Sequence, residues 1–231
     1  MNTDLLNLLK RCDTPTICNA IEVVQGKRGF AAFTHGTVLA SAPEAGAMVG
    51  HAVTAKIAGV TPPEEDDATI RARRMEYYRR MAEAPKPSVA VIEDVDYPGC
   101  VGAYWGEVNT WVHKSFGMSG ALTNGVMRDL GSLAPNFPVV AGSVGPSHGF
   151  VHVRENGTPV TIFGLTVNDG DLVHADRHGA VVIPPDVIGN LVEGIEKLTS
   201  FEGLVLDRAR AGAMDFAAFK DCWEAYERAR V

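Results

Sequence analysis

Arg128 and Asp129 stand side by side within YWGEVNTWVHKSFGMSGALTNGVMRDLGSL, residues 104–133, and of all the groups in the chain they are best suited to chemistry on a small acid. The planar guanidinium of arginine can hold a carboxylate through two hydrogen bonds. The aspartate offers hard oxygen ligands of the kind that Mg²⁺ and Mn²⁺ prefer. The pair therefore predicts a site for an organic acid beside a divalent cation, although helix caps and surface ion pairs are the ordinary alternative.

Gly106 and Glu107 open a predicted helix over residues 106–116. The first backbone N–H groups of a helix have no partner inside the helix. Those near Val108 and Asn109 therefore form a natural anion site, which a substrate carboxylate or oxyanion could occupy.

The elements around these residues should bring them together. SVAVIED (88–94) and GALTNGV (120–126) have the composition of buried strands, and the predicted helix lies between them. Strand, helix and strand at this spacing predict a parallel βαβ unit. In such a unit the C-terminal ends of the strands and the N-termini of the helices lie on one side, so both ends of the motif should meet at one cleft.

The remaining segments also predict an α/β fold. One N-terminal helix would be capped by Thr3, and a second would begin at Thr14–Pro15 and end near Gly26. VGHAVTAKIAG, from Val49, alternates as a strand does, and residues 64–82 predict a helix with a charged outer face. Further strands are predicted in FVHVREN, TPVTIFGLTV and DLVHADRHGAVVIP.

The last segment, 215–228, predicts a helix with a single aromatic stripe that must dock on another surface. The stripe consists of Phe216, Phe219, Trp223 and Tyr226. Since no linker or repeat interrupts the chain, we expect one domain over residues 1–231, with a core at about 14–198 and a helical tail at 201–231.

Composition limits the classes of partner. The formal charge of −7 argues against nucleic-acid binding, and no apolar run is long enough to predict a membrane partner. The four cysteines form no CxxC pair, and MNTDLLNLLKRCDTPT lacks the features of a leader, so we expect a cytoplasmic protein with free thiols. Neither GxGxxG nor GxxxxGK[ST] occurs, so no nucleotide cofactor is expected.

Two residues outside this site could act as catalytic nucleophiles. Ser147 lies in a GxSxG pattern at residues 145–149, but a nucleophile elbow needs a helix to follow, and a β-rich stretch follows here. Lys56 could form a Schiff base if it were buried in an apolar pocket, but the alternation of its strand favours a solvent-facing position.

Other charged groups could bind metal or partners. One of the acids that end the strand at 88–94 could join a metal shell, namely Glu93, Asp94 or Asp96. A second candidate set consists of His174, Asp176 and His178. Because ADRHG is typical of a hairpin turn, a structural use of this set is favoured. The arginines between 71 and 80 are expected to solvate a helix face, with a protein partner as the alternative.

Glu107 is separated from Arg128–Asp129 by twenty residues, and this G-[DE]-x20-R-D pattern resembles the signature of the RraA-like family, which includes 4-hydroxy-4-methyl-2-oxoglutarate aldolases. NGVMRDLGSLAPNFPVVAGSVGPS is similar to the family's DGxVRD…FPVFA stretch, and DGDLVHADRHGAVVIP is similar to its GDxxxxDxxGxxxxP hairpin. The resemblance extends from about Thr14 to about Leu198. Thr123–Asn124 departs from it, because the family often has Val-Asp there.

The resemblance implies a fold and an activity. The fold would be a β/β/α sandwich of the swivelling phosphohistidine-domain type, here with a C-terminal helical extension. It would assemble as a homotrimer or a homohexamer with active sites between subunits. The activity would be that of a divalent-metal-dependent lyase, which cleaves a carbon–carbon bond of a small 2-oxo acid through a metal-stabilised pyruvate enolate and also decarboxylates oxaloacetate.

The resemblance also implies residue roles. Arg128 would hold the substrate carboxylate, Asp129 would ligate Mg²⁺ or Mn²⁺, and Glu107 would reach the metal through water. The residues from Gly106 to Asn109 would present backbone amides to the substrate. The alternative function is a protein-binding regulator of a ribonuclease, since RraA itself inhibits ribonuclease E, but a binding protein does not need Glu107, Arg128 and Asp129 together.

Overall fold

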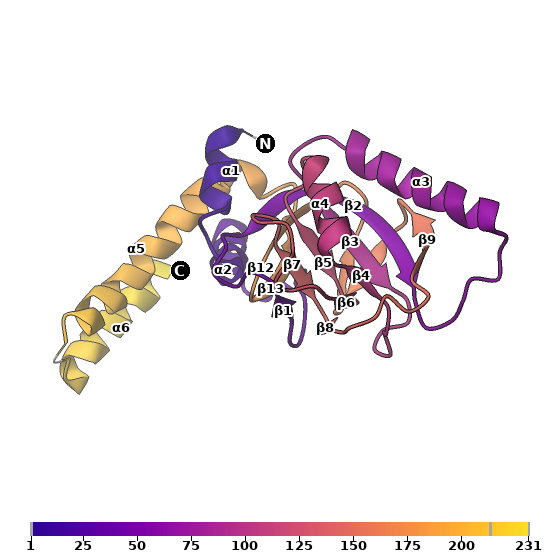
Figure 1. Cartoon of the computed structure of the whole chain (residues 1–231). Coiled ribbons are helices and arrows are strands. Elements are labelled where there is room, and N and C mark those ends of the chain that lie inside the picture. The colour runs from indigo at the N-terminus through magenta and orange to yellow at the C-terminus, as the bar shows by residue number, and fades with distance from the viewer. Residues whose placement is uncertain (1, 213, 231) are drawn as a thin grey trace. The chain divides into compact units, whose positions relative to one another are not determined.

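The structure is a computed structural model that describes residues 2–212 and 214–230 (Figure 1). Contacts within the chain define two compact units. The first contains the chain up to Thr14 together with Ala32–Ile183, and the second contains Pro15–Ala31 together with the chain from Pro184 onwards.

An eight-stranded sheet forms the centre of the first unit. Its order is β1-β7-β5-β3-β2-β12-β13, and β9 pairs with the second half of the long strand β2. The neighbours β2, β3, β5 and β7 run parallel, whereas β1, β9, β12 and β13 are antiparallel to their neighbours. The strands are β1 (Leu39–Ala40), β2 (Met48–Ala58), β3 (Ser88–Asp94), β5 (Ala121–Thr123), β7 (Val139–Ala141), β9 (His152–Asn156), β12 (Leu172–Asp176) and β13 (Gly179–Val182).

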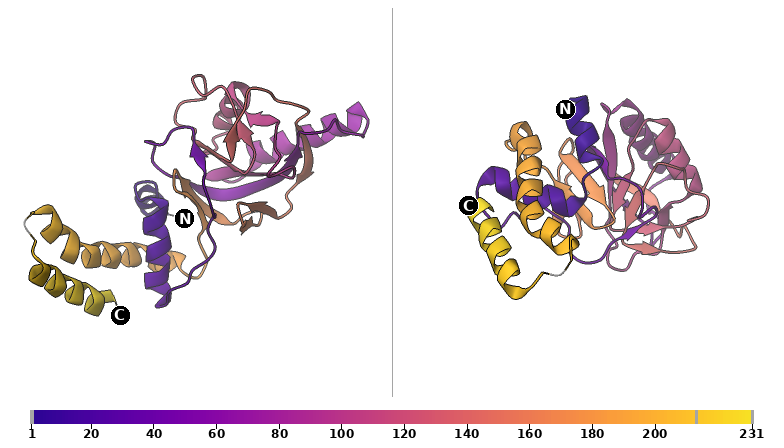
Figure 2. Two further views of the ribbon diagram at one scale, coloured as in Figure 1. Left: turned by 90° about the horizontal axis from the view of Figure 1, so that it is seen from below. Right: turned by 90° about the vertical axis from the view of Figure 1, so that its left-hand side faces the viewer.

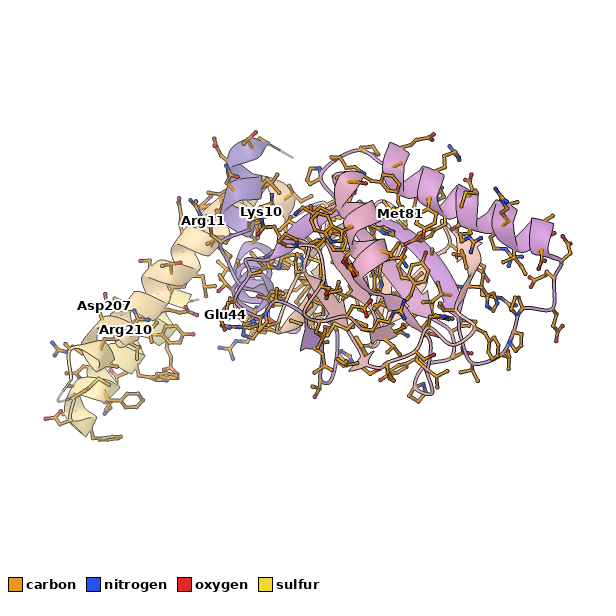
Figure 3. The ribbon with its side chains drawn as sticks, viewed as in Figure 1. Lys10, Arg11, Glu44, Met81, Asp207 and Arg210 are labelled. Atoms are coloured by element: carbon orange, nitrogen blue, oxygen red, sulfur yellow. The ribbon has the colours of Figure 1, made fainter. Side chains whose placement is uncertain are left out.

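The two faces of this sheet bury different sets of side chains. On one face Ala90 and Ile92 of β3 pack with Tyr77 and Met81 of α3 (Asp67–Glu83), and Met81 is labelled in Figure 3. On the other face the alternate residues of β3 pack against the hairpin of β10 (Val160–Ile162) and β11 (Leu165–Val167). Burial on both faces explains why the central strands are apolar at nearly every position.

A second, smaller sheet carries the motif residues. It is fully parallel and consists of β4 (Ala103–Trp105), β6 (Val126–Met127) and β8 (Ser143–Val144). The helix α4 (Glu107–Ser115) begins immediately after β4, with Gly106 as its N-cap residue. Figure 1 shows α4 close to this sheet.

The first helix, α1 (Thr3–Leu9), differs from prediction at its start. Asn2 rather than Thr3 is the N-cap residue, because its side-chain oxygen accepts the hydrogen bond of Leu5 N–H at 2.8 Å. Asparagine and threonine are both favoured at this position, so residue type alone could not show whether Asn2 or Thr3 is the N-cap residue.

The second unit is helical. It contains most of α2 (Thr14–Gln25), the 3₁₀ turn η1 (Ile188–Asn190), α5 (Leu191–Arg210) and α6 (Phe216–Arg230). Figure 2 shows α5 and α6 as an antiparallel hairpin. The predicted aromatic stripe is confirmed, since the ring centroids of Phe219 and Trp223 lie 5.6 Å apart and those of Trp223 and Tyr226 lie 5.3 Å apart.

Most predicted elements are confirmed, including the parallel pairing of β3 with β5 around α4. The predicted strand 120–126 was wrong as a single element, because it divides into β5 and β6, which belong to different sheets. The fold is mixed α/β with a curled sheet. Among the described residues, no helix combines the length and the apolar character that crossing a bilayer requires.

Candidate active site

The small parallel sheet brings the two halves of the motif together. Trp105 at the end of β4 pairs with Met127 at the end of β6, and the backbone N–H of Arg128 donates to the carbonyl of Trp105 at 2.8 Å. Gly106 and Arg128 therefore leave adjacent strands side by side. The predicted meeting of the two ends occurs, but the strands that produce it are β4 and β6 rather than β3 and β5.

The break between β5 and β6 has a physical cause in Asn124. Its side-chain Oδ1 accepts the backbone N–H of Asp94 at 2.7 Å, and its Nδ2 donates to the carbonyl of Asp94 at 3.2 Å. At Gly125 a side chain would begin 3.0 Å from the Asp94 Cβ, so the chain passes close to β3 at this point. These contacts end β5 and direct the next residues into the second sheet.

Asp129 connects the strand side of the site to the helix side. Its Oδ2 accepts the backbone N–H of Glu107 at 3.1 Å and lies 3.6 Å from the Nε of Arg128. The residue has a φ of 56°, in the left-handed region that aspartate adopts more readily than most residues. Its carboxylate thus lies at the N-terminus of α4, where the helix dipole favours negative charge.

Gly106 permits this close approach. A Cβ at this position would lie 2.6 Å from the Oδ2 of Asp129 and 3.0 Å from the Nε of Arg128. Both distances are shorter than ordinary contacts, so any other residue here must displace the side chains of Asp129 and Arg128.

Arg128 and the first turn of α4 are exposed to solvent. The Arg128 side chain is 34% exposed, and its buried Nε has no hydrogen-bond partner among the described residues. Val108 is 73% exposed, and Glu107 is exposed as well. Since a guanidinium carries five N–H donors, Arg128 retains donors for an incoming carboxylate.

The side chain of Asn109 has a structural role rather than a free one. Its Nδ2 donates to the carbonyl of Tyr104 at 2.6 Å, and its Oδ1 accepts the hydroxyl of Tyr78 at 2.7 Å. Of this residue only the backbone amide therefore stays available for the predicted contact with substrate.

His113 joins α4 to α3 through a buried hydrogen bond. This role was not predicted from the sequence. Its Nδ1 donates to the carbonyl of Asn109 at 2.6 Å, so its Nε2 accepts the hydroxyl of Tyr77 at 2.6 Å. The ring is fully buried beside Trp105, with centroids 4.8 Å apart. The available signal was the four-residue spacing of Asn109 and His113 on one helix face.

Acidification is expected to destabilise the fold through His113. Burial lowers the pKa of His113 from 6.5 to about 4, so the unfolded chain takes up this proton at a higher pH than the folded chain does. The contribution is therefore fully present above pH 6.5 and is lost between pH 6.5 and about 4. Its size is about 3 kcal/mol, and urea unfolding at several pH values measures it.

A His113→Leu variant provides the control for that experiment. It should be less stable than the wild type at pH 7, because the hydroxyl of Tyr77 loses its acceptor. Its free energy of unfolding should depend less steeply on pH between 6.5 and 4. Burial also lowers the pKa of His174, which contributes a slope of the same sign to both proteins, so equal slopes would contradict the prediction.

The donor groups at this site suit Mg²⁺ or Mn²⁺ better than zinc. Asp129 supplies one half-exposed carboxylate, and no group of three or more His, Cys, Asp and Glu side chains with metal-binding geometry occurs in residues 2–212 and 214–230. Structural zinc sites need such a group, whereas Mg²⁺ is usually held by one or two carboxylates with water and substrate completing the shell. Asp129 would hold the ion, and Glu107, whose backbone N–H donates to the Oδ2 of Asp129, would act through water.

The two alternative nucleophiles lie in unfavourable settings. The strand β9 follows Ser147, so the helix of a nucleophile elbow does not occur there, and the Oγ of Ser147 accepts the N–H of Gly149. Lys56 forms an ion pair with Glu155 at 3.3 Å.

The acids at the end of β3 accept hydrogen bonds from backbone N–H groups. The Oε2 of Glu93 accepts the N–H of Thr161, and the Oδ2 of Asp96 accepts the N–H groups of Gly59 and Val60. Asp94 is buried, and burial raises its pKa although the N–H of Asp96 opposes the shift. None of these contacts indicates a metal ligand.

His174 and Asp176 lie in the β12–β13 hairpin, and their contacts are structural. The Nδ1 of His174 lies 3.1 Å from the Oγ1 of Thr14, and its Nε2 lies 2.9 Å from the carbonyl of Leu9. The Oδ2 of Asp176 accepts the N–H of Thr14 at 2.9 Å, and its Oδ1 accepts that of His178. The hairpin thus fastens the N-terminal segment to the sheet, in agreement with the structural use favoured above.

Comparison with known proteins identifies a matching family and several relatives. Residues 14–182 match the family described as RraA-like: Aldolase/RraA. Protein DlpA of Legionella pneumophila is 31% identical over 113 residues, covering 48% of this chain and 18% of that protein. A Halalkalibacterium halodurans protein, provisionally named a 4-hydroxy-4-methyl-2-oxoglutarate aldolase, is 30% identical over 127 residues, covering 52% of this chain and 57% of that protein. The chain thus matches 18% to 57% of the lengths of these curated relatives.

A solved structure shows the same fold. RraAS2 of Streptomyces coelicolor, described as an unusual member of the RNase ES inhibitor RraA protein family, superposes with a TM-score of 0.66. The two chains are 22% identical, and the alignment covers 87% of this chain and 95% of the other.

The curled sheet, the small parallel sheet and the Arg128–Asp129 pair at the start of α4 define a mixed α/β protein with a compact polar site. Because the family match covers most of the chain, the protein belongs to the RraA-like family.

Proposed function

We propose that this protein is a divalent-metal-dependent lyase that cleaves a carbon–carbon bond in a small 2-oxo acid. The observation that carries the proposal is the convergence of Arg128, Asp129 and the first turn of α4 at one open surface. The aldolase name of the Halalkalibacterium relative supports the reaction class.

Substrate binding would rest on Arg128 and the helix start. The guanidinium holds the carboxylate of the 2-oxo acid, and the backbone N–H groups of Val108 and Asn109 donate to its oxygens. Asp129 already accepts the N–H of Glu107, so the next two amides of the turn would be the ones to donate to the ligand. One guanidinium and two amides suit a short, doubly oxygenated acid.

Asp129 would also hold the divalent ion. A cation there supplies Lewis acidity toward the carboxylate and keto oxygens of the substrate. Gly106 keeps the Asp129 carboxylate and the Arg128 guanidinium within reach of the same substrate.

The bond-breaking step differs between two substrates. In 4-hydroxy-4-methyl-2-oxoglutarate the C3–C4 bond breaks, the C4 hydroxyl loses its proton through water to Glu107, and the electron pair passes to the fragment that becomes the pyruvate enolate. In oxaloacetate the same bond breaks with loss of carbon dioxide and needs no base. Arg128 stabilises the enolate oxygen in both reactions, and protonation at C3 gives pyruvate.

Pyruvate release from both substrates tests the proposal. We expect release with Mg²⁺ or Mn²⁺, none above background with excess EDTA, and at least a 100-fold lower rate in Asp129→Ala, since the loss of a metal ligand removes several kcal/mol of charge stabilisation, equivalent to a factor of about 100 or more.

The controls distinguish catalysis at the site from decarboxylation by free metal ions in solution. Each rate is compared with metal alone, because free divalent ions decarboxylate oxaloacetate slowly. Asp186→Ala removes another exposed carboxylate and should leave the rate unchanged. If Asp129→Ala equalled the wild type, or if no metal gave release from either acid, the proposal would be wrong.

We further propose that the fold is a β/β/α sandwich of the swivelling phosphohistidine-domain type and that the protein forms a homotrimer or homohexamer with sites between subunits. The exposure of Val108 beside the site supports an interface there. The molar mass in solution tests the oligomeric state, and a monomer would contradict the proposed assembly.

A further inference from the structure

The arginines of α3 fall into two groups. Three of the five are paired: Arg73 with Glu65, Arg79 with Glu76 and Glu83, and Arg80 with Asp169. Arg71 and Arg74 form neither an ion pair nor a hydrogen bond with any residue that the structure describes. Both Arg71 and Arg74 are exposed.

Arg71 and Arg74 line one cavity, which the paired arginines of α3 do not reach. The cavity has a volume of about 620 Å³ and lies between α3 and the segment 148–153. It shares no lining residue with Gly106–Asn109, Arg128 or Asp129, so it is separate from the candidate active site. The lining also contains one carboxylate, that of Asp67, but the two guanidinium groups outnumber it, so the charge at the cavity favours an anionic ligand.

The rest of the lining is mainly apolar. Ile70, Val151 and Phe150 contribute hydrocarbon surface, and Phe150 is 55% exposed although it is a large aromatic residue. A ligand with a hydrocarbon body would cover part of this surface, which an inorganic anion could not do.

His152 adds a polar group that no part of the described protein satisfies. The residue is only 7% exposed, and its Nδ1 donates to the carbonyl of Phe150 at 2.8 Å. Its Nε2 is buried and has no hydrogen-bond partner among residues 2–212 and 214–230. An unsatisfied buried nitrogen is costly, and no contact with the described residues offsets that cost at Nε2.

We infer that this cavity is a second binding site, for a small carboxylic acid with an apolar body. The carboxylate would bind Arg71 and Arg74, and the body would lie against Ile70, Phe150 and Val151. The inference does not depend on the proposed lyase activity, because it uses none of the residues assigned to that activity.

Benzoate is a suitable probe, with benzamide as the uncharged analogue and acetate as the analogue without the ring. By calorimetry on the full chain we expect benzoate to bind and both analogues to bind at least about tenfold more weakly. Arg71→Gln and Arg74→Gln should each weaken benzoate binding. Arg79→Gln is the matched control, because it removes the same charge from the same helix away from the cavity, and it should bind benzoate like the wild type.

Several results would overturn the inference. They are no benzoate binding at millimolar concentration, equal binding by Arg71→Gln and Arg79→Gln, and benzamide or inorganic phosphate binding as tightly as benzoate. A change of molar mass in Phe150→Ser would also overturn it, because it would show that a second copy of the chain covers the cavity. Thermal unfolding of each variant confirms that lost binding is not lost folding.

Discussion

Replacing Arg128 with glutamine is expected to slow pyruvate release from both oxaloacetate and 4-hydroxy-4-methyl-2-oxoglutarate by about 100-fold or more. The guanidinium would lie beside the carboxylate and the oxygen that becomes negative, and one well-placed donor of this kind contributes about 3 kcal/mol. The fold should tolerate the change, because the Nε of Arg128 forms no hydrogen bond and its partly exposed ion pair with Asp129 contributes little to stability. Steady-state kinetics should show a raised KM and a lowered kcat.

Two further variants show whether the loss has the expected cause. Arg128→Lys keeps the charge but not the planar fork, so it should recover only part of the rate. Glu107→Gln should slow cleavage of the hydroxy acid, which needs a base, and spare the decarboxylation, which does not. A normal rate in Arg128→Gln would remove the residue from the site, and an equal effect of Glu107→Gln on both substrates would remove its role as base.

Adding one methyl group at Gly106 is expected to inactivate the protein almost as strongly. The Cβ of Gly106→Ala would lie 2.6 Å from the Oδ2 of Asp129 and 3.0 Å from the Nε of Arg128, so these side chains must move apart. A displacement of about 1 Å can cost about 100-fold in rate. Since Gly106 has a φ of −142°, alanine adopts this backbone without strain, and the stability should change by about 1 kcal/mol or less.

Gly131→Ala is the matched control, because it makes the same change in the loop after Asp129. A Cβ at Gly131 would have no atom within 4 Å, so its activity and stability should equal those of the wild type. Activity in Gly106→Ala would show that the arrangement of Arg128 and Asp129 is not what the reaction requires. Loss of the cooperative thermal transition would instead show that the glycine is needed for folding.

Patterns of apolar residues predicted the parts of the fold that depend on regular burial. The strand SVAVIED appears as β3, and the predicted helix 106–116 appears as α4. Both are long enough for periodicity to show, and β3 is buried on both faces. The convergence of Arg128 with Gly106 was also predicted, since the ends of parallel elements gather on one side of a sheet.

The elements that produce that convergence could not be predicted from periodicity. β4 has three residues and β6 has two, which is too short for any pattern. The same holds for contacts between distant segments, such as Tyr77 with His113 and Tyr78 with Asn109. The spacing of Asn109 and His113 places them on one helix face, but nothing local shows that Tyr77 and Tyr78 bind them. Only the packing of α3 beside α4 shows that these contacts hold the start of the candidate site in place.

The contact between α2 and α5 has a consequence for how this chain can be shortened. Gly194 of α5 lies so close to α2 that a Cβ there would come within 3.0 Å of the Ala20 carbonyl and 2.6 Å of Val24. The family match includes α2 but stops at residue 182, before α5 begins. The family match and the helical unit therefore have different boundaries. A recombinant fragment cut where the family match ends would keep α2 and discard α5.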